Sequence, residues 1–210
     1  ATIGDGELVY VATSSLIGRT RNFTSATPNY VDVTGSITGT IVDFILDPFD
    51  PKNVALCVTT TSVWRTTNLD STPPTWTQKL SGETLLKRIR ATITQQNLFV
   101  LYRTDTANQA NTVQIRRTTD GGDTWGSWIS LVTGTHGDGH LSAGAFDVSQ
   151  HQNPQVIYAL GFTGIFSDFA GNRRAVFRST NGGTSYAQLL AKPNGQYFAT
   201  DLHIPYNNNS

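Results

Sequence analysis

The chain alternates short apolar runs with clusters of turn-forming residues. The runs are rich in Val, Ile, Phe, Tyr and Thr, and Gly, Asn, Asp and Pro separate them; they are 8–12, 41–46, 54–59, 98–102, 113–117 and 156–160. No segment places apolar residues at the i, i+3, i+4 and i+7 spacing of an amphipathic helix between capping residues. Short strands at this spacing predict an all-β sandwich, barrel or propeller.

A repeated segment distinguishes between these three architectures. Four segments, which we call the box segments, begin with Arg, continue through Asn or Asp and end at Trp or Tyr; they are 19–30, 65–76, 117–125 and 178–186. Their leading arginines are 46, 52 and 61 residues apart. A period of about 40–50 residues with four strands per repeat is typical of a β-propeller.

We therefore expect a propeller of four-stranded antiparallel blades, with four blade units in this chain. Three units are continuous, at about 36–82, 83–132 and 133–192. The remaining unit combines 197–210 with 1–35, because the N-terminal part shows three strands and the C-terminal part shows one. Three arrangements stay open: a closed four-bladed ring, half of a ring assembled with a second chain, or a fragment of a larger propeller. In the closed ring, Tyr197–Ile204 pairs with Leu8–Ala12.

The third box segment carries the most specific motif. Its residues Thr118–Trp125 match the Asp-box pattern Ser/Thr-x-Asp-x-Gly-x-Thr-Trp/Phe, and Ser179–Tyr186 is a close copy with Asn in place of Asp. The chain thus resembles the Asp-box (bacterial neuraminidase repeat) propellers, which include sialidases, xyloglucanases and sortilin-type receptors. The resemblance implies a propeller fold, a secreted or extracytoplasmic location and box turns that lie away from the active site.

The motif residues have a physical role as a turn. An Asp or Asn side chain bonds nearby backbone N–H groups, Gly supplies positive φ, and the final aromatic ring packs between blades. We therefore expect structural roles for nine residues: Thr118, Asp120, Gly122, Thr124, Trp125, Ser179, Asn181, Gly183 and Tyr186.

Candidate ligand-binding residues lie in the long connections. We letter the strands of each blade A to D, from the innermost strand outward; B–C turns and D–A connectors then share one rim. On that rim, an extended segment would point His136, Asp138 and His140 the same way, so that they could hold a divalent ion or a polar ligand. Phe166 and Phe169 belong to an apolar loop that could stack on a sugar or contact a protein partner.

The innermost strands carry a second set of candidates. Asp43, Arg90 and Asp201 align at equivalent positions, and two carboxylates near a central channel could act as the acid and base of a glycosidase. The alternative is that the carboxylates pair with Arg88 or Arg90. A sialidase-type site would also need further arginines and a Tyr/Glu pair, and this chain has few glutamates.

Composition narrows the classes of partner. Lys and Arg together number 15, as do Asp and Glu, so no basic field attracts nucleic acid. Apolar runs fall short of the ~18 residues that a spanning helix needs, and the single Cys57 excludes an intrachain disulfide. No cofactor is expected.

Taken together, these features favour a non-catalytic module outside the cytosol that binds a protein or a glycan through its B–C and D–A loops. Further blades or a second chain could complete the ring. The alternative function is part of a secreted glycoside hydrolase, xyloglucanase- or sialidase-like, with Asp43 and Asp201 at the channel.

Overall fold

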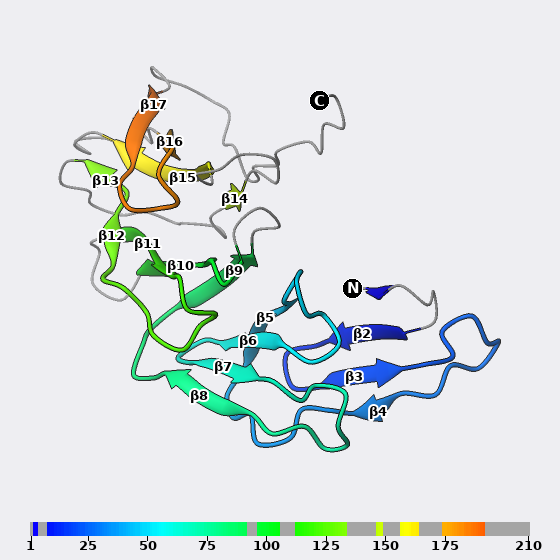
Figure 1. Cartoon of the computed structure of the whole chain (residues 1–210). Coiled ribbons are helices and arrows are strands. Elements are labelled where there is room, and N and C mark those ends of the chain that lie inside the picture. Colours follow the sequence, from blue (N-terminus) through cyan, green and yellow to red (C-terminus); the bar gives the residue numbers. More distant parts are fainter. Residues whose placement is uncertain are drawn as a thin grey trace.

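The computed structural model of the chain describes residues 2–3, 8–91, 96–105, 112–133, 146–148, 156–163 and 174–191. The regular structure of these residues consists of β-strands in four sheets (Figure 1). This part of the chain contains no helix of the length and apolarity that a membrane crossing needs.

Consecutive strands pair with one another in each sheet. The first sheet has β1 (Thr2–Ile3), β2 (Leu8–Ala12), β3 (Ile17–Thr20) and β4 (Val31–Asp32). The second has β5 (Ile41–Leu46), β6 (Ala55–Thr59), β7 (Val63–Thr66) and β8 (Thr77–Leu80). The third has β9 (Leu86–Ala91), β10 (Phe99–Asp105), β11 (Thr112–Thr118) and β12 (Ile129–Ser130).

The fourth sheet departs from this pattern by one strand. It has β14 (Phe146–Val148), β15 (Ile157–Thr163), β16 (Arg174–Ser179) and β17 (Ala187–Ala191), and β13 (Val132–Thr133) runs parallel to β15 at Phe162 and Thr163. All other described strand pairs in the four sheets are antiparallel. Sequence reasoning missed β13, because a two-residue extension of a connector leaves no periodic signal.

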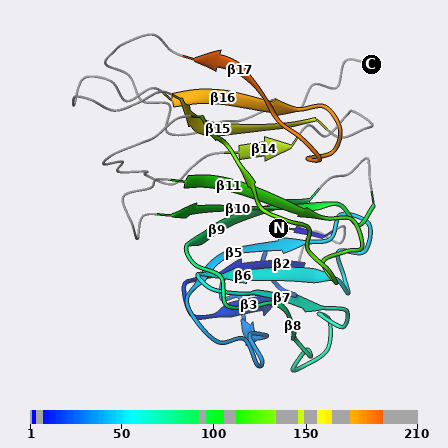
Figure 2. The same ribbon diagram turned by 90° about the vertical axis from the view of Figure 1, so that its left-hand side faces the viewer.

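The sheets follow one another along an open arc (Figures 1 and 2). The innermost strands lie on its concave side, where β5 contacts β9 and β9 contacts β14. The outermost strands β4, β8, β12 and β17 lie on its convex side. This arrangement confirms the predicted all-β fold of four-stranded, blade-like units.

One expectation about the N-terminal unit is wrong. Sequence reasoning gave residues 1–35 three strands, but β1 adds a fourth, with Thr2 opposite Val9 and Ile3 opposite Leu8. β1 therefore occupies the edge of β2 that was assigned to Tyr197–Ile204. The segment 197–204 itself lies outside the described residues.

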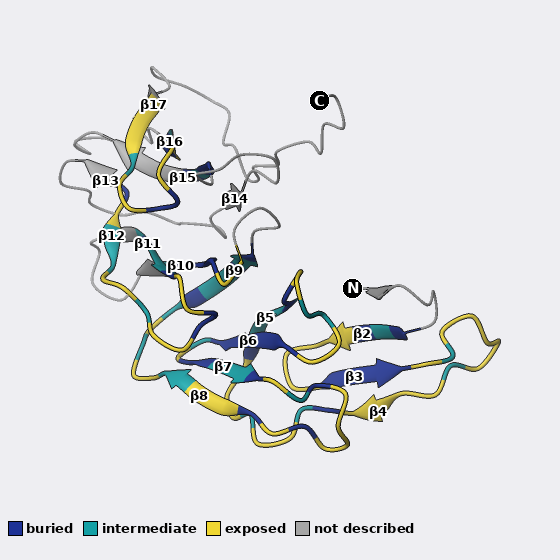
Figure 3. Cartoon of the chain, viewed as in Figure 1, coloured by how far each residue is buried: buried dark blue, intermediate teal, exposed yellow. Residues whose placement is uncertain are grey.

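The core consists of three apolar layers between successive sheets. The strand β6 lies between two of these layers, and all five of its residues are buried (Figure 3). Ala55 and Cys57 pack in the layer toward the first sheet, and Leu56 and Val58 pack in the layer toward the third. A strand buried on both faces needs a continuous apolar run rather than an alternating one, and 54–58 is such a run.

Candidate functional site

The third box segment folds as a hydrogen-bonded turn. The Oδ1 atom of Asp120 accepts from Thr118 Oγ1 at 2.6 Å and from the Thr124 amide at 2.9 Å. The Thr118 hydroxyl oxygen accepts from the amide of Gly122 at 3.0 Å. Burial works to raise the pKa of Asp120, but hydrogen bonds from Thr118, Thr124 and the Asp123 amide together lower it to about 2.

The same turn recurs in all four box segments. The hydroxyl of Ser or Thr lies at 2.6–2.9 Å from the Asx oxygen two residues later; the pairs are Thr20–Asn22, Thr66–Asn68, Thr118–Asp120 and Ser179–Asn181. The Asx oxygen also accepts a backbone amide beyond the turn in each copy. These side chains are therefore engaged within their own turns.

The glycine and the aromatic residue of the third box segment serve its contact with the second sheet. Gly122 has φ +95°, and a Cβ there would lie 2.6 Å from Leu56 Cδ2 of the second sheet. Trp125 packs against the layer between the second and third sheets, but its ring is half-buried. Trp76, at the matched position of the second box segment, is buried and donates from Nε1 to the Val33 carbonyl at 3.0 Å.

The rim opposite the box turns carries a pocket of about 450 Å³ between the first and second sheets. We call the two edges the box rim and the loop rim. The pocket is lined by the end of β2, by the B–C turn after it and by the first half of β5: Tyr10, Ala12, Thr13, Ser14, Ile41, Val42, Asp43 and Phe44. The amide of Ile41 donates to the Ser14 carbonyl at 2.8 Å, which holds the B–C turn against β5.

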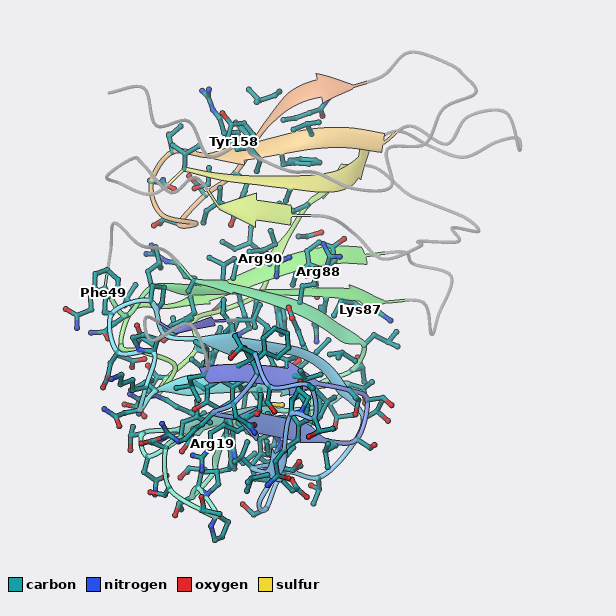
Figure 4. All side chains as sticks on the ribbon, turned by 90° about the vertical axis from the view of Figure 1, so that its right-hand side faces the viewer. Arg19, Phe49, Lys87, Arg88, Arg90 and Tyr158 are labelled. Carbon is teal, nitrogen blue, oxygen red and sulfur yellow. The ribbon has the colours of Figure 1, made fainter. Side chains whose placement is uncertain are left out.

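Asp43 links this pocket to the third sheet. Its Oδ2 atom accepts from the Ile89 amide at 2.9 Å and from Arg90 Nη1 at 3.3 Å, and Oδ1 accepts from the Phe44 amide at 3.0 Å. The pairing of β5 with β6 shifts register between Ile41 and Asp43, directly before the Asp43 side chain. Figure 4 shows Arg90 on β9, together with Arg88.

Burial dominates the electrostatics of Asp43. Loss of water raises its pKa, and the hydrogen bonds and the charge of Arg90 offset this only in part, so the pKa stays above its ordinary value. Two of the predicted site residues, Asp43 and Arg90, are thus brought together as an ion pair. Of the two partners that the sequence offered, the salt bridge in the structure is to Arg90.

A second charged cluster lies at the same rim, around Glu83. Its carboxylate bridges Arg103 Nη1 at 2.6 Å and Arg116 Nη1 at 2.7 Å. It also accepts from Trp128 Nε1 at 3.1 Å, and the Arg103 guanidinium lies 4.1 Å from the centre of the Trp128 ring. The Glu83 amide donates to the Thr61 carbonyl, which fixes the D–A connector to the second sheet.

The Glu83 cluster was missed by sequence reasoning, and so were Tyr10, Thr13, Ser14 and Phe44 of the pocket. Glu83 offered one signal, since glutamate occurs only at positions 7 and 83 of the chain. Its partners come from three separate elements, so their spacing along the chain gives no pattern.

The remaining predicted ligand-binding residues lie outside the described part of the chain. They are His136, Asp138, His140, Phe166, Phe169 and Asp201. Among the residues that the structure describes, no three His, Cys, Asp or Glu side chains form a group that could hold a metal ion. The candidate site therefore rests on the pocket with Asp43 and Arg90.

Comparison with protein-family models and with curated proteins finds no match. Among solved structures, the chain is similar to an ancestral GH74 enzyme, with a TM-score of 0.56 and 16% identity. The fold is that of part of a β-propeller. The match covers 90% of this chain and 24% of that chain, so this chain spans about a quarter of the enzyme's length. At this identity the likeness shows the fold alone.

Proposed function

We propose that the chain is a non-catalytic, extracytoplasmic module of the Asp-box propeller type that binds a glycan in the pocket between its first two sheets. The observation that carries this proposal is the lining of that pocket. Phe44 supplies a half-buried aromatic ring, backed by the buried ring of Tyr10 with centroids 6.1 Å apart, and Thr13 and Ser14 supply hydroxyl groups. Concave sites with an aromatic ring and a few placed polar groups are typical small-ligand sites.

The charge of the pocket supports a neutral sugar as the ligand. Asp43 accepts hydrogen bonds, and its charge is balanced by Arg90 at 3.3 Å. Sugar hydroxyls donate to and accept from such groups, and the apolar face of a sugar ring packs on an aromatic ring. An anionic sugar would have to approach the Asp43 carboxylate, so we expect neutral oligosaccharides to bind best.

Two features favour binding over hydrolysis. Asp43 is the one carboxylate among the described residues that line the pocket, whereas glycoside hydrolysis commonly uses a pair. Both oxygens of Asp43 also hold hydrogen-bond donors already, from Phe44, Ile89 and Arg90. A carboxylate whose two oxygens already accept hydrogen bonds is suited to a structural role.

Hydrolysis is the second candidate function, and one observation favours it. The pKa of Asp43 is raised, as it must be for a general acid. The likeness to a GH74 enzyme is compatible with this role, which would make the chain part of a xyloglucanase-like hydrolase.

Calorimetric titration with neutral oligosaccharides, including xyloglucan fragments, tests the proposal. Sialyllactose serves as the charged comparison. We expect binding of a neutral sugar, and Ser14→Trp should weaken it by roughly tenfold or more because the indole fills the pocket. Ser127→Trp, at another exposed position, is the matched control.

The outcome of these measurements distinguishes binding from hydrolysis. Binding that Ser14→Trp leaves unchanged, or no binding of any glycan, would overturn the proposal. Release of reducing ends that disappears in Asp43→Asn would establish hydrolysis instead.

A further inference from the structure

The first box turn contains the tripeptide Asn22-Phe23-Thr24, which fits the sequon for N-linked glycosylation. Such a sequon is Asn-x-Ser/Thr with x other than Pro, and it marks a surface asparagine that can receive an oligosaccharide in a secreted protein. The tripeptide lies in the connection between β3 and β4, where residues 23–27 are exposed (Figure 3). The atom that glycosylation modifies is the amide nitrogen Nδ2 of Asn22.

The side chain of Asn22 uses its oxygen, and not its nitrogen, to hold the turn. Oδ1 accepts from Thr20 Oγ1 at 2.8 Å and from the Asn29 amide at 3.0 Å. A backbone N–H can only donate, so the atom that meets the Asn29 amide must be the oxygen. Nδ2 donates no hydrogen bond within the part of the chain that the structure describes. A sugar on Nδ2 would therefore leave both bonds of the oxygen in place, because a substituted amide keeps its carbonyl.

The two other asparagines of the box turns differ from Asn22 in both respects. Their Nδ2 atoms donate to a hydroxyl oxygen, at 3.4 Å from Asn68 and at 2.9 Å from Asn181. Two positions later, Asp70 and Gly183 stand where a sequon needs Ser or Thr. In the four box turns, all of which the structure describes, Asn22 alone combines a sequon with an unbonded amide nitrogen.

The accessibility of Asn22 does not depend on what precedes the first sheet. The second box turn is contacted by the first sheet, because Arg19 donates to the carbonyls of Leu69 at 3.2 Å and Asp70 at 2.6 Å. Asn68 in that turn is nevertheless partly exposed, as Asn22 is. The Asx side chains of the box rim thus stay accessible where a preceding sheet binds the backbone of the turn.

We propose that Asn22 is an acceptor of N-linked oligosaccharide when the chain is exported. The donor is an oligosaccharide joined to a membrane lipid through pyrophosphate, and the enzyme is an oligosaccharyltransferase. A bond forms between Nδ2 and C1 of the first sugar, and the bond between C1 and the pyrophosphate oxygen breaks. The lipid pyrophosphate leaves, and the proton of Nδ2 passes to a base. The inference rests on the extracytoplasmic location proposed above and not on the pocket, which lies at the opposite rim.

Secretion of the 210-residue chain from eukaryotic cells, directed by an added signal sequence, tests this proposal. Peptide N-glycosidase in heavy-oxygen water removes the sugar and converts the modified asparagine to labelled Asp, which peptide mapping locates. We expect label at position 22 in the wild type and its complete loss in Asn22→Asp. That variant should keep the turn, because the carboxylate of Asp120 accepts the matching bonds in the third box turn.

Two substitutions of Thr24 separate the sequon from the asparagine. Thr24→Ser keeps the hydroxyl group and should keep the label at position 22, whereas Thr24→Val should lose it although Asn22 is present. Near-ultraviolet circular dichroism confirms that the variants are folded. The sequon at 208–210 lies outside the described residues, and its label maps to a different peptide. A secreted wild type without label at position 22, or equal label in Thr24→Val, would overturn the proposal.

The same proteins separate this inference from the proposed ligand. Wild type and Asn22→Asp should bind neutral oligosaccharides with equal affinity in calorimetric titration, because the sugar on Asn22 and the pocket lie at opposite rims. A chain that carries the label but binds no oligosaccharide would contradict the proposed pocket and support glycosylation of Asn22. A chain that binds but carries no label at position 22 would do the reverse.

Discussion

Asp120 on the box rim and Asp43 near the loop rim are both held by hydrogen bonds, yet their pKa values move in opposite directions. Asp120 is exposed and receives its bonds from residues within four positions, so its pKa falls to about 2. Asp43 is largely buried and receives bonds from another sheet, but burial outweighs them and its pKa rises. Burial works to raise the pKa of both carboxyl groups, and the hydrogen bonds together outweigh it at Asp120 but not at Asp43.

The two rims differ in the same way as these two residues. On the box rim, the Ser or Thr hydroxyl and the Asx side chain of each turn bond within that turn. On the loop rim, Asp43 and Glu83 join residues of different elements. The Thr–Asx turns of the box rim are therefore a repeated local structure, whereas the ion pairs of the loop rim depend on how the sheets are assembled.

Removal of an aromatic ring from the box rim should have the largest effect on stability. Trp76→Ala deletes a buried ring and leaves the Val33 carbonyl without its partner, so we expect a loss of about 3–5 kcal/mol in the free energy of unfolding. Trp125→Ala should cost less, because the Trp125 ring is half-buried. Denaturation with urea measures both. Equal losses would contradict the difference in burial.

Gly122→Ala should have the next largest effect. The new Cβ would meet Leu56 Cδ2 at 2.6 Å in a backbone with φ +95°, and overpacking together with the strained φ should cost about 2–4 kcal/mol. Gly82→Ala is the matched control, since Gly82 has φ +71° and nothing within 4 Å. The difference between the two unfolding free energies measures the contact between sheets. No difference would mean that Leu56 moves aside freely.

Glu83→Gln tests the loop rim directly. The change leaves Arg103 and Arg116 close together without their shared carboxylate, and we expect a loss of about 1–3 kcal/mol. Asp123→Asn is the comparison on the box rim, where the carboxylate pairs with Arg65 and Lys79 but is 46% exposed. That variant should lose at most about 1 kcal/mol. A larger loss for Asp123→Asn in thermal or urea unfolding would reverse the proposed contrast between the rims.

Asp120→Asn should have the smallest effect at neutral pH, because Asn68 and Asn181 form the same turn in other box segments. The effect of the substitution on stability should appear at acid pH. The folded pKa of Asp120 lies below the unfolded one, so its ionised form stabilises the wild type above pH 3.8, and this stability is lost as pH falls toward 2. The variant should lack this part of the acid dependence. Identical pH profiles of unfolding for both proteins would show that Asp120 is not the group responsible.

Local patterns made much of the fold predictable. The six apolar runs named from the sequence all form strands, namely β2, β5, β6, β10, β11 and β15, because each is a β-prone run bounded by turn residues. The degenerate segment 19–30 also forms the Thr–Asx turn of the stronger copies. The strand β1 was not predicted, because Thr2–Ile3 is too short to show a periodic pattern.

The candidate site was predictable only in part. Asp43 and Arg90 were found because both lie on innermost strands, whose equivalence follows from the repeat. The pocket beside them was not predicted, since it forms where the B–C turn of the first sheet meets the first residues of β5. That meeting depends on the angle between sheets, which no spacing along the chain encodes.

Local patterns in the sequence determine most of the strands and the four box turns, because these depend on contacts within a turn or on the run of apolar residues along a strand. The tertiary structure alone decided which charges meet. It placed Asp43 against Arg90, gathered Glu83 with two arginines and a tryptophan, and covered Arg19. The reason is that burial and pairing depend on the neighbouring sheet, as Arg19 shows, since it is buried against the box turn of the second sheet.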